Sequence, residues 1–355
     1  MPIYRVALLG FGNVGRALAQ LLLRKEDELR QRYGLEVVVT GIATGRHGMA
    51  LNPQGIDLTQ ALALAEAGED LTALGLEPPP TDSLDFVRRV AADVLFENTP
   101  VNYETGEPAI SHLRLALERG MHAITANKGP VVHAFHELRR LARCQGRRFL
   151  FESAVMDGAP VFALYEATLP GAQVLAFEGI LNSTTNLILS RMEEHGETLE
   201  QAVAYAQSIG IAETDPSGDI DGWDAAIKVA ALVTVLMGRP FTPQQVQRQG
   251  IRHLTLDDVR AAAAQGKRWK LVCSARRTSD GGIEARVEPQ LVGPASPLYG
   301  VMGTSSIVLL ETDVLGHLAL REDDPTPHTT AYGLLADFLR AVGAKAETLA
   351  LGGSP

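Results

Sequence analysis

The stretch YRVALLGFGNVG, residues 4–15, joins an apolar run to the pattern G-x-G-x-x-G at Gly10, Gly12 and Gly15. The apolar run predicts a β-strand, and the leucines after Gly15 predict a helix. In this setting the first glycine permits a tight turn, the second lets the backbone approach a pyrophosphate, and the third lets the helix pack on the strand. The start of the helix also attracts phosphate charge. We therefore predict a dinucleotide site formed by the whole turn: Gly10, Phe11, Gly12, Asn13, Val14 and Gly15.

The second predicted strand, residues 37–43, ends where the adenosine ribose of a bound dinucleotide would lie. An acidic residue at this place favours NAD, because its carboxylate accepts a hydrogen bond from the ribose 2′-hydroxyl. The chain instead has Thr44, Gly45, Arg46 and His47, and a guanidinium suits the 2′-phosphate of NADP. We predict that Arg46 contacts NADP; use of NAD and a purely solvated loop arginine stay open as alternatives.

Strands alternate with helices as far as about residue 153, and this alternation predicts a Rossmann-type, doubly wound parallel sheet. Ligands of such sheets collect at the carboxyl ends of the strands, where Asn98, Thr99, Pro100 and Lys128 fall. Further strands are expected at 93–97, 122–125 and 147–153, and helices at 57–76, 108–119 and 130–145.

Beyond residue 153 the pattern changes to neighbouring strands separated by short turns, which predicts a mixed or antiparallel sheet in an α+β domain. We therefore expect a nucleotide-binding domain over 1–153 and a catalytic and dimerisation domain over 154–327. A C-terminal helix within about 328–355 is expected to pack back on the first domain. The strands of the second domain are predicted at 171–181, 269–276, 283–287, 306–311 and 317–321.

Composition excludes several classes of protein. The 355 residues are 46% hydrophobic, enough for two cores, and a net charge of −10 without a basic tract argues against a nucleic-acid partner. Cys144 and Cys273 are too few for a disulfide framework, and we expect both to be buried. With neither a membrane-span pattern nor a leader sequence, the chain is expected to be cytoplasmic.

The second informative stretch, GIAETDPSGDIDGWDAAIK at 210–228, crowds five carboxylates around one lysine. Asp224 and Lys228 are four residues apart, so on a helix their side chains share one face. A plain surface ion pair is one interpretation. However, the apolar run VAALVTVLMG that follows should be buried, and a lysine at the start of a buried helix is a candidate acid–base group.

Taken in order, the motifs resemble those of homoserine dehydrogenases. The NSTTN element and the pattern D-x-x-G-x-D-x-x-x-K are far more specific than the glycine motif. The matching segments run over most of the chain: GFGNVG (10–15), ENTP (97–100), TANKGP (125–130), FES with Gly-Ala-Pro (151–160), GILNSTTNLIL (179–189), AETDPSGDIDGWDAAIK (212–228) and the P-x-x-P-L stretch from Pro294.

This resemblance implies NAD(P)-dependent, reversible hydride transfer between L-homoserine and L-aspartate 4-semialdehyde, within the biosynthesis of threonine, methionine and isoleucine. Lys228 would be the proton donor and acceptor, assisted by Asp224. A developing alkoxide needs both a proton and a nearby positive charge, which an ammonium supplies. Substrate contacts would come from Glu213, Asp219, Ser183, Thr184 and Lys128, and Lys128 would also lie beside the cofactor together with Thr99. Alternatively, Asn182, Ser183 and Thr184 could simply cap the helix that follows.

The resemblance also implies a monovalent cation, Na⁺ or K⁺, held by main-chain oxygens at Glu152, Val155, Asp157 and Ala159. Here the chain departs from the family, because many members have glycines where Val155–Gly158 stands. A second departure is Asp323–Pro327, which replaces a glycine-rich loop near the nicotinamide.

These departures keep two other functions open: a related dehydrogenase acting on another amino-acid aldehyde or oxo acid, and a nucleotide-binding regulator without turnover. The presence of both Lys228 and Asp224 argues against the regulator. The family is usually a homodimer paired through the sheet of the second domain, and we expect the same here. We expect no ACT domain and therefore no feedback inhibition through one.

Overall fold

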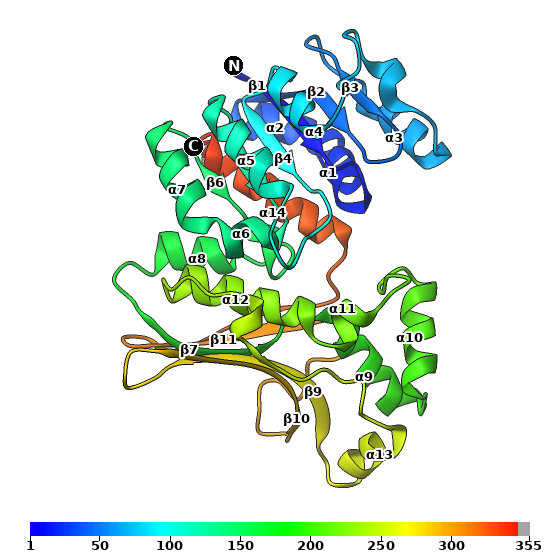
Figure 1. Cartoon of the computed structure of the whole chain (residues 1–355), viewed down its shortest axis with the longest axis vertical. Helices are drawn as coiled ribbons and strands as arrows, with labels where there is room; N and C mark the ends of the chain where they lie inside the picture. The colour runs from blue at the N-terminus through cyan, green and yellow to red at the C-terminus, as the bar shows by residue number, and fades with distance from the viewer. Residues whose placement is uncertain (347–355) are drawn as a thin grey trace, which may run out of the picture.

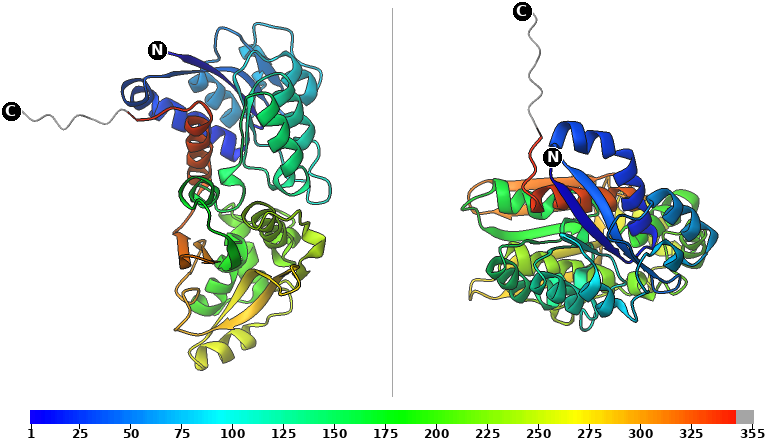
Figure 2. Two further views of the ribbon diagram at one scale, coloured as in Figure 1. Left: turned by 90° about the vertical axis from the view of Figure 1, so that its left-hand side faces the viewer. Right: turned by 90° about the horizontal axis from the view of Figure 1, so that it is seen from above.

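The structure is a computed structural model that describes residues 1–346. Residues 347–355, part of the C-terminal segment expected to pack on the first domain, lie outside the described residues. Figure 1 shows two lobes, one above the other, and Figure 2 shows the same separation after a quarter turn. Each lobe is built on its own six-stranded sheet. After the domains expected from the sequence, we call the lobe that contains β1 to β6 the nucleotide lobe and the lobe that contains β7 to β12 the substrate lobe.

The sheet of the nucleotide lobe has the order β3-β2-β1-β4-β5-β6, in which only β3 runs antiparallel to its neighbour. This is the doubly wound arrangement that the alternating pattern predicted. The strands are β1 (Ile3–Leu9), β2 (Glu36–Ala43), β3 (Met49–Leu51), β4 (Val94–Glu97), β5 (His122–Thr125) and β6 (Phe149–Leu150).

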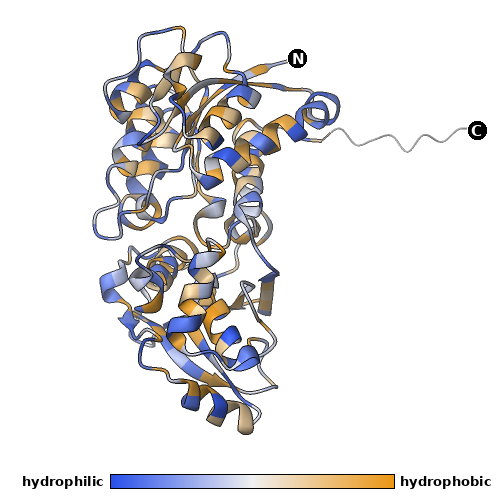
Figure 3. Cartoon of the chain, turned by 90° about the vertical axis from the view of Figure 1, so that its right-hand side faces the viewer, coloured by the Kyte–Doolittle hydropathy of each residue, from blue (hydrophilic) through white to orange (hydrophobic). Residues whose placement is uncertain are grey.

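Helices cover both faces of this sheet, and Figure 3 shows apolar and polar residues mixed along them, as amphipathic helices require. The helix predicted over 130–145 is divided in two. The helices are α1 (Asn13–Arg24), α2 (Glu26–Tyr33), α3 (Leu58–Ala67), the 3₁₀ helix η1 (Leu71–Leu74), α4 (Ser83–Arg89), α5 (Ala109–Glu118), α6 (Lys128–His133) and α7 (Phe135–Cys144).

Two strands of this sheet differ from expectation. The strand predicted over 147–153 is only two residues long, because the chain turns into the 3₁₀ helix η2 (Glu152–Ala154) and leaves the sheet. The short edge strand β3 was not predicted, since its neighbourhood is glycine-rich and reads as a loop. It forms because a turn, closed by a hydrogen bond from Thr44 N to Gly48 O (3.0 Å), folds the chain back on β2.

The substrate lobe has the sheet order β12-β11-β7-β9-β10-β8, antiparallel except where β8 pairs with β10. The prediction of a mixed sheet is confirmed. The strands are β7 (Val174–Ile180), β8 (Gln247–Arg248), β9 (Arg268–Arg277), β10 (Ile283–Val292), β11 (Ser306–Thr312) and β12 (Gly316–Glu322).

Helices lie on the side of this sheet that faces the nucleotide lobe (Figure 1). The sequence predicts a capping box at Thr198 with Gln201 and further helix starts at Thr242 and Thr255. The capping box at Thr198 forms, and helices begin after the other two threonines as well. The helices are α8 (Val161–Thr168), α9 (Ser183–His195), α10 (Leu199–Ser208), α11 (Ser217–Ile220), α12 (Trp223–Leu236), the 3₁₀ helix η3 (Pro243–Gln245) and α13 (Leu256–Ala264).

The last helix, α14 (Pro327–Ala341), returns to the nucleotide lobe. Leu334 and Phe338 of α14 belong to the same apolar core as Leu18 and Leu21 of α1. The chain therefore crosses between the lobes twice, once before α8 and once after β12. Cys273 is buried as expected, whereas Cys144 is exposed, contrary to expectation. Among residues 1–346, no helix has both the length and the apolar composition needed to cross a bilayer.

Candidate active site

The turn between β1 and α1 has the geometry that the three glycines predicted. Gly10 has a φ of +97°, and a Cβ there would lie 2.4 Å from Asn98 O. A Cβ on Gly15 would lie 2.3 Å from Gly10 O, so the helix could not pack as closely. At Gly12 no atom of the described chain lies within 4 Å of the same position. The N-terminus of α1, which no side chain caps, therefore faces open space that suits a phosphate.

The other predicted cofactor residues of this region differ in exposure. Phe11 is buried in the core of the lobe, so its main chain is the part left to face a ligand. Asn13 is exposed and accepts a hydrogen bond from Arg16 (2.9 Å), while Val14 is half-buried. Arg46 is exposed in the turn between β2 and β3, beyond the carboxyl end of β2.

Asn98, Thr99 and Pro100 follow β4 directly, and Asn98 O lies against Gly10. The side-chain amide of Asn98 is buried, and neither its nitrogen nor its oxygen has a hydrogen-bond partner among the described residues. Such an unpaired buried group costs about 1–3 kcal/mol. A dinucleotide bound along the neighbouring turn would offer polar partners, so these residues fit the cofactor that the glycine turn predicts.

Across the cleft, Lys228 and Asp224 form an ion pair on α12. Lys228 Nζ lies 3.1 Å from Asp224 Oδ2 and donates a hydrogen bond to Leu181 O (2.6 Å). Only 13% of the Lys228 side chain and 11% of the Asp224 side chain are exposed. The pair is thus not the solvated surface contact that the spacing alone allowed.

Two further residues hold Asp224 from other elements. Lys128, the first residue of α6 in the nucleotide lobe, places Nζ 3.3 Å from Asp224 Oδ1. Asn182 Nδ2 donates to Asp224 Oδ2 (2.9 Å) and to Asp219 Oδ1 (2.6 Å), while Asn182 Oδ1 accepts from Thr185 N and caps α9. The asparagine of the NSTTN motif therefore both caps a helix and bridges two carboxylates.

The charges in this cluster stabilise one another. Burial alone would raise the pKa of Asp224, but the charges of Lys228 and Lys128 and the Asn182 amide outweigh burial and lower it. Burial likewise opposes the ammonium of Lys228, yet Asp224 and Asp157 raise its pKa above the ordinary value. The pKa of Asp219 is raised by burial and by the charge of Asp224. Lys228 is thus held as an ammonium.

The cluster lies in a cleft of about 880 Å³ between the lobes. All the predicted substrate residues line it: Lys128, Ser183, Thr184, Glu213, Asp219, Asp224 and Lys228. Glu213 is exposed in the loop between α10 and α11. The cleft can therefore take a small polar molecule between an ammonium and several carboxylates.

Sequence reasoning missed two residues near this cluster. Tyr103, in the loop after β4, lines the cleft from the nucleotide lobe, and burial together with nearby Asp224 and Asp219 raises its pKa. Glu322 at the end of β12 accepts a hydrogen bond from Gly158 N (3.4 Å), and burial and Asp157 raise its pKa to about 7. No motif singled out either residue; Tyr103 reaches the cleft only through tertiary packing.

The four positions predicted to hold a cation lie together at the first crossover. The Glu152 carboxylate accepts hydrogen bonds from Phe162 N and Ala163 N (2.7 Å each) and pairs with Arg340 (3.2 Å), so its side chain is fully used at the start of α8. Asp157 has a φ of +43° and accepts a hydrogen bond from Thr330 (2.6 Å). Within residues 1–346, no cluster of three or more His, Cys, Asp or Glu side chains could hold a metal ion.

Hydride transfer to or from a carbonyl carbon needs a nicotinamide and a group that carries a proton at the carbonyl oxygen. The fold supplies the dinucleotide turn and the cleft supplies the buried ammonium, which together place the chain among the NAD(P)-dependent oxidoreductases.

Comparisons with known proteins narrow this class. The family described as homoserine dehydrogenase, NAD binding domain, matches residues 10–152, and the family described as homoserine dehydrogenase matches residues 160–339. The NAD(+)-dependent homoserine dehydrogenase of Pseudomonas canavaninivorans is 37% identical over 342 residues, which are 96% of this chain and 96% of that protein.

Solved structures agree. The putative homoserine dehydrogenase of Archaeoglobus fulgidus superposes with a TM-score of 0.84 at 30% identity, covering 96% of this chain and 100% of that one. A hyperthermophilic archaeal homoserine dehydrogenase in complex with NADPH gives a TM-score of 0.80 at 30% identity, over 96% and 98% of the two chains. The chain belongs to the homoserine dehydrogenase family.

Proposed function

We propose that the chain interconverts L-homoserine and L-aspartate 4-semialdehyde with Lys228 as the proton donor and acceptor. The observation that carries this proposal is the position of Lys228 Nζ, which is buried, fixed by Asp224 and Leu181 O, and located in the cleft between the lobes. Family membership supports the substrate pair, and the role in threonine, methionine and isoleucine biosynthesis stays a prediction.

The nicotinamide, when bound, supplies the hydride for reduction and accepts it for oxidation. Lys228 acts at the oxygen of the substrate. In reduction its ammonium donates a proton to the developing alkoxide and stabilises the negative charge. In oxidation the amine must first lose its own proton before it can accept one from the hydroxyl. Because its neighbours raise the pKa of Lys228, oxidation should be favoured by alkaline pH.

The substrate has an ammonium and a carboxylate of its own. Glu213 is exposed and lines the cleft, so its carboxylate is accessible to the substrate ammonium. Asp219 lies close to the same wall. Ser183, Thr184 and Lys128 offer donors for the substrate carboxylate.

The test is a comparison of wild-type protein with Lys228→Ala and Lys267→Ala. Lys267 is an exposed lysine of the same lobe and serves as the matched control. Lys228→Ala should lower kcat by about 10²–10⁴-fold while nucleotide affinity stays nearly unchanged. In this variant the rate of homoserine oxidation should no longer increase with pH. Lys267→Ala should match the wild type. If Lys228→Ala keeps most of its kcat, the proposed role is wrong.

A related substrate remains the second candidate, because two departures from the family have structural consequences. Asp157 and Asp324 are the two non-glycine residues of the described chain with positive φ, +43° and +47°, a conformation that favours glycine. They lie in the two segments, 155–158 and 323–327, at which the sequence departs from the pattern of the family. The same assay run with other hydroxy amino acids separates the candidates, since higher kcat/KM for any of them than for homoserine would favour a different substrate.

For the nicotinamide we propose NADP, with NAD as an alternative. Arg46 beyond β2 and the lack of a carboxylate at residues 44–47 support NADP. The relative from Pseudomonas canavaninivorans is named as NAD(+)-dependent, whereas the archaeal structure holds NADPH. The ratio of kcat/KM for the two nucleotides decides between them.

We also propose a monovalent cation, Na⁺ or K⁺, at the main-chain oxygens of Glu152, Val155, Asp157 and Ala159. Within the described chain the carbonyl oxygens of Val155 and Asp157 accept no hydrogen bond, which leaves them available as ligands. The carbonyl oxygen of Ala159 already accepts a hydrogen bond from Val161 N (2.8 Å), so the four positions match a cation site only in part.

We propose a homodimer formed through the open face of the sheet in the substrate lobe. The register places Ala319, Leu309 and Glu178 side by side on this face. They line a hollow of about 610 Å³ together with Ser274 and Arg286. The helices of the lobe cover the opposite face, so this one is available for a second copy. The cytoplasmic location stays a prediction.

A further inference from the structure

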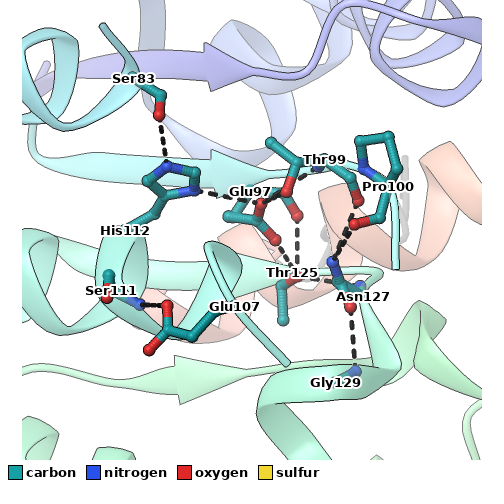
Figure 4. A network of polar contacts seen from close by, with 10 residues as sticks. All are labelled: Ser83, Glu97, Thr99, Pro100, Glu107, Ser111, His112, Thr125, Asn127 and Gly129. Carbon is teal, nitrogen blue, oxygen red and sulfur yellow. Dashed lines mark hydrogen bonds and ion pairs between the residues drawn. The ribbon is translucent and has the colours of Figure 1, made fainter. Parts of the chain in front are cut away.

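A buried network connects the loops that follow β4 and β5 (Figure 4). At its centre is Glu97, the last residue of β4, whose side chain is completely buried. Its carboxylate accepts hydrogen bonds from Thr99 N (3.1 Å), from the Thr99 hydroxyl and from the Thr125 hydroxyl (3.0 Å). One carboxylate thereby ties together the carboxyl ends of two neighbouring strands.

The network closes through Asn127. Its main-chain nitrogen donates to the Thr125 hydroxyl (2.9 Å), and its side-chain nitrogen donates to Thr99 O (3.0 Å) and Pro100 O (3.4 Å). Asn127 Oδ1 accepts from Gly129 N (2.9 Å) and so caps α6. Lys128, the first residue of α6, is the residue that contacts Asp224 across the cleft.

His112 of α5 lies behind Glu97. Its Nδ1 is 3.6 Å from Glu97 Oε1 and its Nε2 is 2.7 Å from the hydroxyl of Ser83. His112 is 1% exposed, so this part of the network is buried as well. From the sequence alone, His112 is expected to lie on the surface of a helix or to have a packing role.

A buried carboxylate is an unfavourable choice for stability alone, because ion burial costs more than apolar packing of similar volume. Glu97 is nevertheless satisfied by donors from the loop after β4 and from the end of β5. The loops that follow these two strands carry groups of two different sites. Asn98 and Thr99 lie beside Gly10 of the glycine turn, whereas Lys128 lies beside Asp224. Glu97 is therefore the structural connection between the nucleotide side and the acid–base side of the cleft.

We infer that Glu97 is a positioning residue for hydride transfer. Through Thr99, Thr125 and Asn127 it fixes the position of residues 98–100, beside which the nucleotide would bind, relative to Lys128. The inference rests on the proposed function, in that hydride transfer to or from homoserine is the reaction measured. It goes beyond that function by assigning a role to a residue that does not line the cleft.

The test uses Thr125→Val, which removes one hydroxyl of the network at nearly constant volume. The matched control is Thr40→Val, which removes a buried hydroxyl bonded to Ala91 O (2.9 Å) in the same sheet, on the side of the amino end of β4. Four quantities are compared: the melting temperature, the Kd for NADPH and NADH from their fluorescence, kcat, and the primary isotope effect with homoserine deuterated at the hydroxyl-bearing carbon.

Thr125→Val should lower kcat by about 10–100-fold, as small misplacements of reacting groups do. It should also raise the isotope effect and weaken nucleotide binding several-fold. Thr40→Val should share any loss of melting temperature but keep the other three values. Glu97→Gln should retain more activity than Glu97→Met, because an amide can still accept from Thr99 N and donate to Thr125.

The inference is overturned if Thr125→Val folds and keeps the wild-type kcat, isotope effect and Kd. If Thr125→Val does not fold, equal kcat in Glu97→Gln and Glu97→Met overturns it. A wild-type protein that does not turn over homoserine would contradict the proposed function instead. In that case the nucleotide affinities of the same variants still test whether Glu97 fixes the position of residues 98–100.

Discussion

At the level of single residues, the carboxylates of the cleft differ in how firmly they are held by other side chains. Asp224 is shared by Lys228, Lys128 and Asn182, and Asp219 is held by Asn182. Glu213 is exposed and has no such partner among the described residues. Glu213 is therefore more accessible than Asp224 to the ammonium of a substrate, as the proposed function requires.

Substitution of Glu213 tests this division of roles. Glu213→Gln should raise the KM for homoserine by about 10-fold or more, because a charge-assisted hydrogen bond to a charged group contributes about 1.5–3 kcal/mol. The kcat and the Kd for the nucleotide should change little, since the side chain is not part of the Lys228 cluster. Steady-state kinetics with both substrates varied give all three quantities.

Glu194→Gln is the matched control, because Glu194 is exposed on α9. An unchanged KM in Glu213→Gln would remove Glu213 from the substrate site. A fall in kcat alone would instead make it part of the acid–base cluster.

Among the secondary-structure elements, those defined by local patterns were predicted well. The strand, glycine turn and first helix follow from adjacent residues, as do the capping box at Thr198 and the helix starts at Thr242 and Thr255. The helix spacing of Asp224 and Lys228 also placed them on one face, and their charged atoms lie 3.1 Å apart.

Features that depend on distant parts of the chain could not be predicted. β3 exists only because β2 offers it an edge, and Tyr103 enters the cleft because the two lobes face each other. Asn182 was recognised as a possible cap, but its contact with Asp224 joins residues that are 42 apart in the chain. The network around Glu97 is of the same kind, since its members come from α4, α5, the ends of β4 and β5 and the loops that follow these strands (Figure 4).

In the glycine turn, alanine at Gly15 and alanine at Gly12 should affect two different properties: the stability of the fold and the binding of the nucleotide. Gly15→Ala should destabilise the fold by about 1–3 kcal/mol, because its Cβ would meet Gly10 O at 2.3 Å. Gly12→Ala should leave the melting temperature nearly unchanged, because the space around it is open in the described chain, but it should weaken nucleotide binding by at least about 10-fold.

Thermal melts and titration of nucleotide fluorescence measure the two effects, and each variant is the control for the other. If Gly12→Ala binds NADPH and NADH as tightly as the wild type, the phosphates do not lie against this turn.

In the molecule as a whole, the two sheets have different surroundings. Helices cover both faces of the nucleotide sheet but only one face of the other sheet, whose second face holds the hollow lined by Leu309 and Arg286. Arg276 and Glu311 also pair on this face (2.8 Å). An open sheet face with both charges and apolar residues suits a self-complementary contact between two copies.

If the homodimer forms there, the wild type should have a mass of twice 38.0 kDa in light scattering after gel filtration. Leu309→Asp should shift it towards the monomer, because it introduces a charge into the contact. Leu76→Asp, at a residue that is 64% exposed in the nucleotide lobe, should leave the mass unchanged. A wild-type monomer, or a Leu309→Asp dimer, would contradict this interface.

The return of α14 to the nucleotide lobe has a consequence for biosynthesis on the ribosome. The apolar side of α1, with Leu18 and Leu21, is covered by Leu334 and Phe338. These two residues are translated only after β12, which completes the other sheet. The lobe that is begun first is therefore finished last. A nascent chain halted before Pro327 would carry a complete second sheet beside a first lobe with its hydrophobic interior uncovered, which is a target for chaperones.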